Sequence, residues 1–271
     1  MEPFAGKIVV ITGGASGIGR AVGAQLVRHG ARVVLADING ESVGATAAAI
    51  GATSAATVDV RDAAAVEQLV SSTVATHGRL DYMFNNAGIA IMGEARNMTL
   101  ADWTQLIDVN VRGVINGVFA AYPVMVRQGF GHIVNTASIA GLVPTPGATG
   151  YATTKHAVVG LSTGLRAEAA GLGVKVSAVC PGIIDTPLKY GTRLINPDAD
   201  RDKLLNSLPI KLYPVEDCAR DILRGVARNQ GIIIVTRGAK LLSLWYRWTP
   251  SLFMRISEKT ATRSPLLTRG G

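Results

Sequence analysis

The sequence predicts a single α/β domain built around a doubly wound, mostly parallel β-sheet with helices on both faces. Two observations support this prediction. Short runs of β-branched residues alternate with longer amphipathic stretches along most of the chain, and strand–helix alternation of this length is typical of such sheets. Most of the short runs are apolar at every position, as in parallel strands that helices cover on both sides. We expect one domain over residues 1–236, without a linker or an internal repeat, followed by an extension over residues 237–271.

Seven strands are expected, at Ile8–Thr12, Arg32–Asp37, Ala55–Val60, Leu80–Asn85, His132–Ser138, Val174–Cys180 and Ile232–Val235. Helical patterns lie between them, at 17–29, 62–77, 99–129, 151–171 and 215–229. Local signals support three helix ends. Gly30 suits the left-handed residue after the first helix, and Asp62 can cap the second. Thr99, with Asp102 three residues later, resembles a capping box.

The charge of the chain is concentrated at its C-terminal end. The net charge is +8, but residues 237–271 hold seven basic residues and one acid, which gives +6 there and leaves +2 for the first 236 residues. A nearly neutral body argues against binding to nucleic acid. Hydrophobic residues make up 48% of the chain and charged residues 17%, so a substantial core can be buried.

Cysteine usage and hydropathy favour a cytoplasmic protein. No secretory signal is visible, and no run of about 18 apolar residues indicates a helix that spans a membrane. The two cysteines, Cys180 and Cys218, show no metal-like spacing, and neither do the four histidines. We therefore expect ordinary reduced thiols and no bound metal, with peripheral membrane contact left open by the extension.

Glycines crowd the turn between the first strand and the first helix. They allow a tight turn and a close approach of backbone N–H groups to a pyrophosphate, to which the helix N-terminus adds partial positive charge. A purely structural turn is the alternative, but the strand before it, the helix after it and an acid downstream favour a dinucleotide site. The expected cofactor contacts in this turn are Gly13, Ser16, Gly17, Ile18 and Gly19.

The acid is Asp37, which ends the second strand 18 residues after Gly19. A carboxylate there can accept hydrogen bonds from both hydroxyls of an adenosine ribose and would repel a 2′-phosphate. The next two residues, Ile38 and Asn39, are not basic, so NAD is favoured over NADP as the cofactor. Arg20, in the first helical turn, is the one residue that points the other way.

A tyrosine and a lysine four residues apart, Tyr151 and Lys155, share one face if their segment is helical. A phenol with a pKa of about 10 is a poor base near neutrality, and a lysine cation beside it lowers that pKa. Ser138 ends the fifth strand, at the sheet edge where ligands bind in open α/β folds. Its hydroxyl could bind a substrate oxygen and stabilise a developing alkoxide.

The joint order and spacing of these residues over 7–190 resemble the short-chain dehydrogenase/reductase family. The pattern is carried by Thr12-Gly13-x-x-x-Gly17-x-Gly19, Asn85-Asn86-Ala87-Gly88 and Tyr151-x-x-x-Lys155. The resemblance implies a Rossmann-type sheet of strand order 3-2-1-4-5-6-7 and an NAD-binding, catalytic domain in a homodimer or homotetramer. It also implies hydride transfer between NAD(H) and a secondary alcohol or ketone, an activity on CH–OH donors.

The same resemblance assigns roles to further residues. The catalytic set would be Ser138, Tyr151 and Lys155, with Asn110 holding a water in a proton relay that reaches Lys155. The remaining expected cofactor contacts are Asp59 and Val60 at the adenine, Asn86 and Ala87 on the adenine-ribose side, Pro181 and Gly182 around the nicotinamide, Thr186 at the carboxamide or phosphate and Lys155 at the ribose, together with Gly88, Tyr151 and Ile184.

The substrate is expected to be apolar, such as a steroid, a retinoid or another lipid-like alcohol. A substrate loop is expected at about 183–213, and segments that border the substrate in the family carry Ile89, Ala90, Ile139, Leu142, Val143, Pro144, Ile183, Ile184 and Leu188. Core residues have the same character, so this inference rests on analogy.

The extension departs from many family members. Two of the three tryptophans, Trp245 and Trp248, lie there beside Leu241 and Leu244, in a helix that Pro250 limits to about ten residues. Apolar residues on one side with basic residues around them are typical of an interfacial anchor. A lid over the substrate cleft and a subunit interface are the alternatives.

Two other function classes are considered for the whole chain. One is a catalytically silent protein that uses NAD as a sensor or scaffold, in which we would expect damage to the serine, tyrosine or lysine. All three are intact. The other is a peripheral membrane-binding protein whose extension is the main functional element, which does not exclude catalysis.

Overall fold

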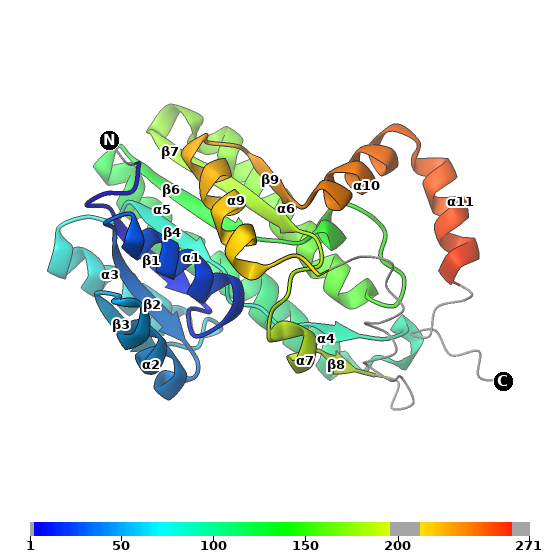
Figure 1. Ribbon diagram of the computed structural model, residues 1–271, viewed down its shortest axis with the longest axis horizontal. Helices are drawn as coiled ribbons and strands as arrows, with labels where there is room; N and C mark the ends of the chain where they lie inside the picture. Colours follow the sequence, from blue (N-terminus) through cyan, green and yellow to red (C-terminus); the bar gives the residue numbers. More distant parts are fainter. Residues whose placement is uncertain (1–2, 196–211, 262–271) are drawn as a thin grey trace.

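A computed structural model describes residues 3–195 and 212–261 of the chain (Figure 1). Its centre is a seven-stranded sheet in the order β3-β2-β1-β4-β6-β7-β9, in which all neighbouring strands are parallel. The strands are β1 (Ile8–Thr12), β2 (Arg32–Asp37), β3 (Ser54–Thr57), β4 (Tyr82–Asn85), β6 (Gly131–Thr136), β7 (Val174–Pro181) and β9 (Ile232–Val235). The predicted Rossmann-type fold is confirmed.

The strand labels skip two numbers because β5 (Ile91–Met92) and β8 (Arg193–Leu194) form a separate two-stranded parallel sheet. The predicted order 3-2-1-4-5-6-7 counts the seven long strands alone. Two-residue strands carry no hydrophobic period, so the sequence pattern gave no sign of the small sheet. It joins the segment after β4 to the segment after β7, beside the carboxyl edge of the main sheet.

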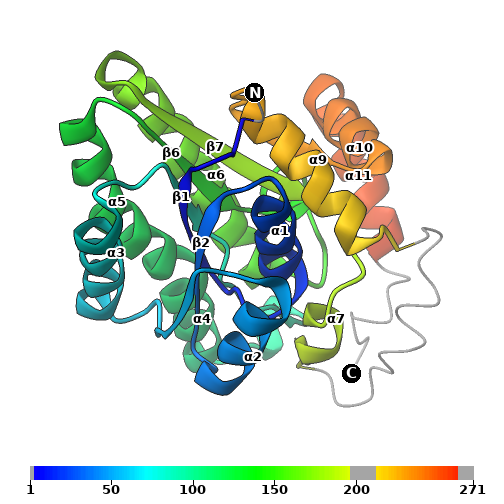
Figure 2. The same cartoon turned by 60° about the vertical axis from the view of Figure 1, so that its left-hand side comes forward.

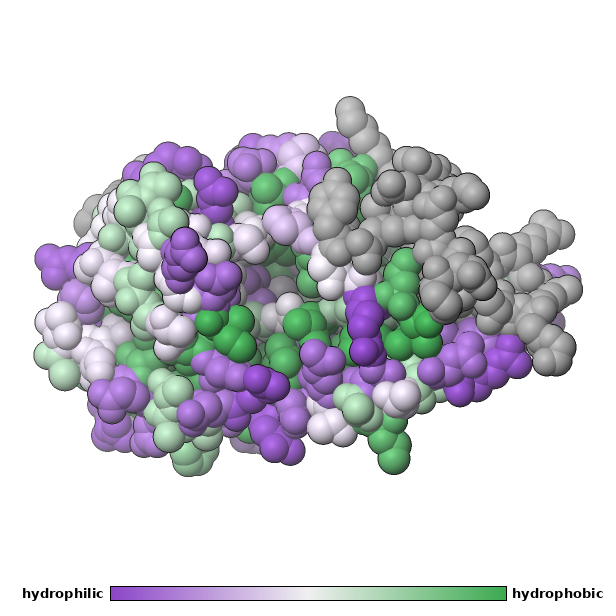
Figure 3. Space-filling view, turned by 90° about the horizontal axis from the view of Figure 1, so that it is seen from below, coloured by the Kyte–Doolittle hydropathy of each residue, from purple (hydrophilic) through white to green (hydrophobic). Residues whose placement is uncertain are grey.

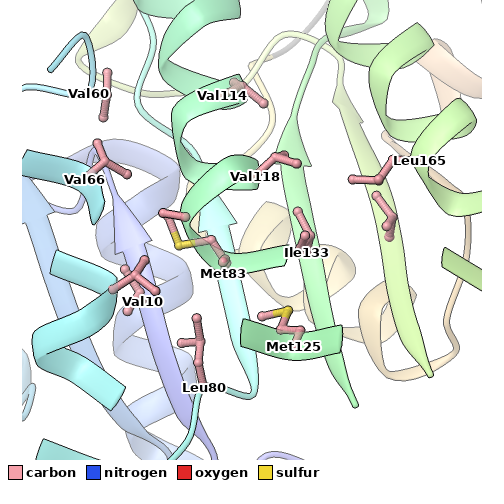
Figure 4. Packing of buried hydrophobic residues seen from close by; sticks show 14 of the residues in the cluster. Val10, Val60, Val66, Leu80, Met83, Val114, Val118, Met125, Ile133 and Leu165 are labelled. Carbon is pink, nitrogen blue, oxygen red and sulfur yellow. The ribbon is translucent and has the colours of Figure 1, made fainter. Parts of the chain in front are cut away.

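Helices cover both faces of the sheet, as Figure 2 shows for α3 and α5 on one side and α1 and α9 on the other. The first layer holds α3 (Ala63–His77), α5 (Gly113–Gln128) and α6 (Thr149–Ala169), and the second holds α1 (Gly17–Arg28), α2 (Gly40–Ile50) and α9 (Val215–Ala227). Alternate residues of one strand face opposite layers: Val10 of β1 belongs to the first core, and Val9 and Ile11 belong to the second. In Figure 4, Val10, Met83 and Ile133 from the strands meet Val66, Val114, Val118, Met125 and Leu165 from the helices.

The predicted helix ends are present. Gly30 directly follows His29, the C-cap residue of α1, and has a φ of +77°. The Asp62 side chain accepts hydrogen bonds from the N–H groups of Ala64 and Ala65 at the start of α3. Thr99 and Asp102 form both halves of a capping box before α4 (Leu100–Ile107).

The predicted helix 99–129 is one continuous helical run. A π-helical turn, η2 (Asp108–Arg112), joins α4 to α5. Within the described residues, the run Leu100–Gln128 is the one helix long and apolar enough to cross a bilayer, but 44% of its most apolar window is buried in the protein. Val114, Val118 and Met125 lie in the core of the domain, which accounts for this hydropathy.

Several boundaries differ from expectation. The third strand ends at Thr57 rather than Val60, because the chain turns where the Asp59 carboxylate accepts the Arg61 N–H. The fifth expected strand, β6, ends at Thr136 rather than Ser138. The helix α2 was missed because exposed alanines at 45, 48 and 49 obscure the helical period of its buried residues, Val43, Thr46 and Ala47.

The extension forms two helices rather than one. Helix α10 (Arg237–Trp248) ends before Pro250, as expected, but α11 (Pro250–Ala261) starts there. The first turn of a helix tolerates proline because its N–H groups lack intrahelical partners. The limit that Pro250 sets to α10 was therefore predicted, but the second helix, α11, was not.

Candidate active site

The glycine turn lies at the carboxyl ends of the central strands. Gly13 and Gly17 have φ values of +65° and +53°. A Cβ on Gly13 would come within 2.8 Å of the Ala87 Cα, and one on Gly19 within 2.1 Å of the Gly13 carbonyl oxygen. These close approaches leave room for glycine alone, and they shape the turn into a cradle of backbone groups.

Helix α1 starts at Gly17, and Ser16 precedes it in an extended conformation without capping the helix through its hydroxyl. Thr186, from the segment after β7, lies over this start: its Cβ is 3.5 Å from the position of a Cβ on Gly17. Thr186 therefore lies close to the start of α1, and the N-terminus of a helix is a place suited to a pyrophosphate. Gly17, Ile18 and Gly19 form the first turn of α1, as expected.

Asn86 ties the end of β4 to the glycine turn. Its side-chain amide donates to the carbonyl oxygens of Thr12 and Gly13, both at 3.2 Å, and accepts from the Thr136 hydroxyl at 3.3 Å. The N–H groups of Asn86 and Ala87 donate to the Thr12 hydroxyl. These bonds give Asn86 a structural role in the turn, and its expected contact with the cofactor stays a prediction.

Asp37 lies at the mouth of the turn. Its carboxylate accepts from the Ala15 N–H and from the Asn39 N–H, each at 3.1 Å. One carboxylate oxygen is thus held by the glycine turn, and the other is held by the backbone two residues after Asp37. The side chain remains half-exposed, so both oxygens can still accept further bonds from a ribose.

Asp59 is bound to a residue that the sequence reasoning did not consider. Arg61 donates to its carboxylate through the backbone N–H and through Nε and Nη2 of the guanidinium. The hydrogen bond from the Arg61 side chain lowers the pKa of Asp59. The neighbouring Val60 is buried against Gly113 of α5. An adenine bound at Asp59 would therefore meet an Asp59–Arg61 pair rather than a lone carboxylate.

The proposed catalytic residues converge at the ends of β6 and β7. Ser138 follows β6, and its hydroxyl accepts from the Ala140 N–H at the start of the short helix η3 (Ile139–Gly141). Tyr151 and Lys155 lie one turn apart near the start of α6. Lys155 is 4% exposed, donates to the Thr136 carbonyl at 2.9 Å and lies 5.6 Å from the centre of the Tyr151 ring.

Burial governs both pKa values. It raises the pKa of Tyr151, against the opposite effect of a hydrogen bond with Ser138. It lowers the pKa of Lys155 to about 8. The expected lowering of the Tyr151 pKa by Lys155 is not found in the polypeptide by itself: desolvation of the phenolate outweighs the hydrogen bond with Ser138, and Lys155 is not among the groups that shift this pKa. The positive charge of a bound nicotinamide ring would lower the pKa of Tyr151.

Asn110 sits in the π-helical turn, buried beside Lys155. Its amide accepts from the Ile89 N–H at 2.9 Å and donates to the Ile89 carbonyl and the Thr154 hydroxyl. A Cβ on Gly88 would lie 3.1 Å from the Asn110 amide oxygen and 3.6 Å from the Lys155 amine. Gly88 thus lies close to both side chains, and the relay from Asn110 through a water to Lys155 stays a prediction.

The segment after β7 completes the site. Pro181 ends the strand, and the Gly182 N–H donates to the Val235 carbonyl at 3.1 Å. Ile184 is buried and forms a parallel bridge with Tyr213. Of the expected substrate loop 183–213, residues 196–211 lie outside the described part of the chain.

One residue at the site was set aside in the sequence reasoning. Cys180 is fully buried, accepts a hydrogen bond from the Ser138 backbone N–H and interacts with Lys155 and Tyr151. Burial raises the pKa of its thiol to about 12, so the group is a neutral thiol at physiological pH. The expectation of an ordinary reduced thiol agrees with this, but the interaction of Cys180 with Lys155 and Tyr151 was missed. The position of Cys180 directly before Pro181 was the feature of the sequence that could have predicted this interaction.

Comparison with known proteins agrees with this geometry. The family model described as short chain dehydrogenase matches residues 7–194. Levodione reductase from Leifsonia aquatica is 35% identical over 221 residues, which cover 78% of this chain and 83% of that protein. The chain belongs to the short-chain dehydrogenase/reductase family.

Two further similarities extend over nearly the whole chain. SadH of Mycobacterium tuberculosis, which is named as an oxidoreductase, is 35% identical over 263 residues that cover 94% of this chain and 95% of that protein. This match must include part of residues 237–271. The crystal structure of a short-chain dehydrogenase/reductase from Burkholderia phymatum in complex with NAD superimposes with a TM-score of 0.83 at 28% identity, covering 93% of this chain and 96% of that one.

Proposed function

We propose that this oxidoreductase interconverts a secondary alcohol and a ketone with NAD(H). The observation that carries the proposal is the placement of Tyr151, Lys155 and Ser138 around one point at the carboxyl edge of the sheet. The glycine turn, whose shape excludes any Cβ at Gly13 and Gly19, fits a dinucleotide beside them. In Figure 3, apolar and weakly polar surface lies in a hollow near the middle of one face, with hydrophilic residues at its rim.

NAD, when bound, supplies the hydride acceptor. In alcohol oxidation, the Tyr151 phenolate accepts the hydroxyl proton and Ser138 donates a hydrogen bond to the substrate oxygen. The buried Lys155 ammonium stabilises that phenolate and orients the ribose hydroxyls. The proposed exit of the proton runs past Lys155 and a water held by Asn110. Ketone reduction uses the same groups in the opposite direction.

The preference for NAD over NADP rests on Asp37. The Asp37 carboxylate would repel the 2′-phosphate of NADP, and no basic residue follows Asp37 directly. Arg20 lies in the first turn of α1 and is exposed. The Asp37 carboxylate is anchored to the glycine turn itself, so it occupies a fixed position at the ribose site.

An apolar substrate is the proposed class. Among the residues expected to border it, Ala90, Val143 and Ile184 are buried in the protein and would support the wall of the site, whereas Leu188 is 42% exposed. The test is to measure NADH formation with a panel of hydrophobic secondary alcohols, alongside sugars and hydroxy acids of similar size. Turnover of the charged or sugar alcohols in preference to the apolar ones would contradict this class.

A homodimer or homotetramer in the cytoplasm is the proposed setting. Three large apolar side chains are exposed along α4 and α5, namely Ile107 at 40%, Ile115 at 45% and Phe119 at 69%. Apolar residues in such a row favour a subunit interface. Both cysteines are free and buried, as suits a reducing compartment. Light scattering on the wild type and on Phe119→Asp tests the assembly, which the substitution should weaken.

A further inference from the structure

The two helices of the extension form a hairpin, α10–α11, that packs as one unit. Phe253 of α11 is buried, and its ring meets Trp245 and Tyr246 of α10 edge-on, with ring centres 4.9 and 5.2 Å apart. The Thr249 N–H donates to the Trp245 carbonyl, and the Phe253 N–H donates to the Thr249 carbonyl. Figure 1 shows the hairpin projecting beyond β9 at the end of the sheet.

Helix α10 has two different faces. Ala239 is buried near Gly182, and Leu242 and Tyr246 are half-buried on the same side. The opposite side is apolar and exposed: Leu241 is 68% exposed and Trp248 is 79% exposed. With Leu244 and Trp245, these residues follow the spacing i, i+3, i+4 and i+7 of a single helical stripe. Leu252, Met254 and Ile256 are further exposed apolar residues, on α11.

Basic residues accompany this stripe. The hairpin, residues 237–261, holds five basic residues and one acid. Lys240 and Arg247 are both exposed on α10, and they lie about 80–100° from Ala239 around the helix axis, between the buried side and the apolar stripe. A solvent-facing helix normally carries its polar residues on the outer side. Here the outer side is apolar, and Lys240 and Arg247 lie along one edge of it.

We propose that the apolar stripe of α10, with its flanking Lys240 and Arg247, binds the surface of an anionic lipid bilayer. Tryptophan and leucine toward the acyl boundary, with Lys and Arg at headgroup level, are the composition of an interfacial helix. A second copy would bring two hairpins of the same positive charge together, which opposes self-association through this face. An anionic lipid surface instead complements both the charge and the apolar stripe.

The hairpin starts beside the active site. A Cβ on Gly182 would lie 2.7 Å from the Thr236 hydroxyl and 3.3 Å from the Ala239 Cβ. Binding of α10 to lipid therefore holds the segment after β7 near the bilayer. Delivery of an apolar alcohol from the bilayer follows from this only if the proposed function is correct, whereas the lipid binding does not depend on it.

The test is cosedimentation of the full chain with phosphatidylglycerol vesicles and with phosphatidylcholine vesicles, at low and at high salt. We expect binding to the anionic vesicles that weakens as salt rises. The double variant Lys240→Glu with Arg247→Glu should lower the partition coefficient at least about tenfold. Arg127→Glu, an exposed arginine of α5, is the matched control and should bind as the wild type does.

The apolar stripe is tested separately. Leu244→Ser with Trp248→Ser should reduce binding at both salt concentrations, since the buried apolar area is lost. Leu172→Ser, which changes a leucine of similar exposure in the helix η4 (Ala170–Leu172), is the control and should have no effect. NADH binding by every variant, measured in the absence of lipid, shows whether the domain is folded.

Tryptophan quenching locates the contact. In the Trp103→Phe variant the two remaining tryptophans, Trp245 and Trp248, both belong to α10. Brominated phosphatidylglycerol should quench their fluorescence. Absence of binding to anionic vesicles at low salt would overturn the proposal. So would a loss of oligomeric mass in the Leu244→Ser, Trp248→Ser variant without lipid, because the stripe would then be a subunit interface. Inactivity on every alcohol with intact vesicle binding would contradict the proposed function alone.

Discussion

The amine of Lys155 donates a hydrogen bond to the carbonyl oxygen of Thr136 at 2.9 Å, which joins α6 to the end of β6. The bond fixes the lysine in the position from which it can reach both the Tyr151 ring and a ribose. Because Lys155 is buried, few polar groups lie near its amine that could take the place of its charge. In the proposed function, Lys155 therefore serves both the cofactor site and the acid–base site.

Replacement of Lys155 by alanine should impair cofactor binding and turnover together. Hydrogen bonds to a charged group contribute about 1.5–3 kcal/mol, so NADH should bind roughly 10–100-fold more weakly. Because burial lowers the pKa of Lys155 to about 8, the ammonium is lost as pH rises through that value, and wild-type NADH affinity should fall there. Fluorescence titration from pH 6.5 to 9.5 measures both effects. Lys175→Ala, at an exposed lysine of β7, is the control; equal affinity in Lys155→Ala and the wild type would contradict the assignment.

Replacement of Tyr151 by phenylalanine should remove the acid–base group and keep the ring. Turnover should fall at least about 100-fold, as is usual for the loss of general acid–base catalysis. NADH affinity should change little, since Lys155 keeps its bond to Thr136. Steady-state kinetics on a confirmed alcohol, with a parallel NADH titration, separates the two quantities. Near-normal turnover of the variant would show that another group transfers the proton.

Much of the site was predictable because its parts are local in sequence. The turn at Gly13–Gly19 and the pair Tyr151 and Lys155 each depend on a spacing within one helix or turn, which a linear pattern records. The meeting of Ser138 with this pair was predictable because carboxyl ends of parallel strands share an edge. The family match then fixed the order of the strands.

What could not be predicted depends on burial and on contacts between neighbouring segments. The pKa of Tyr151 is raised because the ring is desolvated, and desolvation is a property of the whole fold. The pairing of Asp59 with Arg61 depends on a turn that ends β3 early. Helix α11 was missed because proline both ends helices and starts them, and the sequence alone does not distinguish the two uses at Pro250.

Replacement of Asp37 by alanine should weaken NAD binding by roughly 1.5–3 kcal/mol, the scale of hydrogen bonds to a charged group. The preference for NAD over NADP should narrow, because the carboxylate that repels a 2′-phosphate is gone. Asp37→Asn separates the two effects: its amide oxygen can keep one acceptor bond of the glycine turn, but it carries no charge. Titration of each protein with NADH and NADPH gives the ratio. A wild type that binds NADPH as well as NADH would refute the role of Asp37.

The buried histidine of β6 should set the acid sensitivity of the fold. The His132 Nε2 lies 2.8 Å from the Ser177 hydroxyl, and burial lowers its pKa to about 3, with smaller effects of the same sign from Lys175 and Arg166. A histidine with a pKa below its unfolded value of about 6.5 binds fewer protons in the folded state, so its contribution to stability is lost as pH falls from 6.5 toward 3.

Between pH 7.5 and pH 5 this contribution amounts to about 1–2 kcal/mol of the free energy of unfolding, at 1.36 kcal/mol for each pKa unit. His132→Gln should therefore lose less stability over this interval than the wild type, even where its stability at pH 7.5 is lower. Urea denaturation at the two pH values measures the difference. His156→Gln, at an exposed histidine of α6, should retain the wild-type pH dependence. If His132→Gln and the wild type lose the same free energy between pH 7.5 and pH 5, the acid sensitivity arises from groups other than His132.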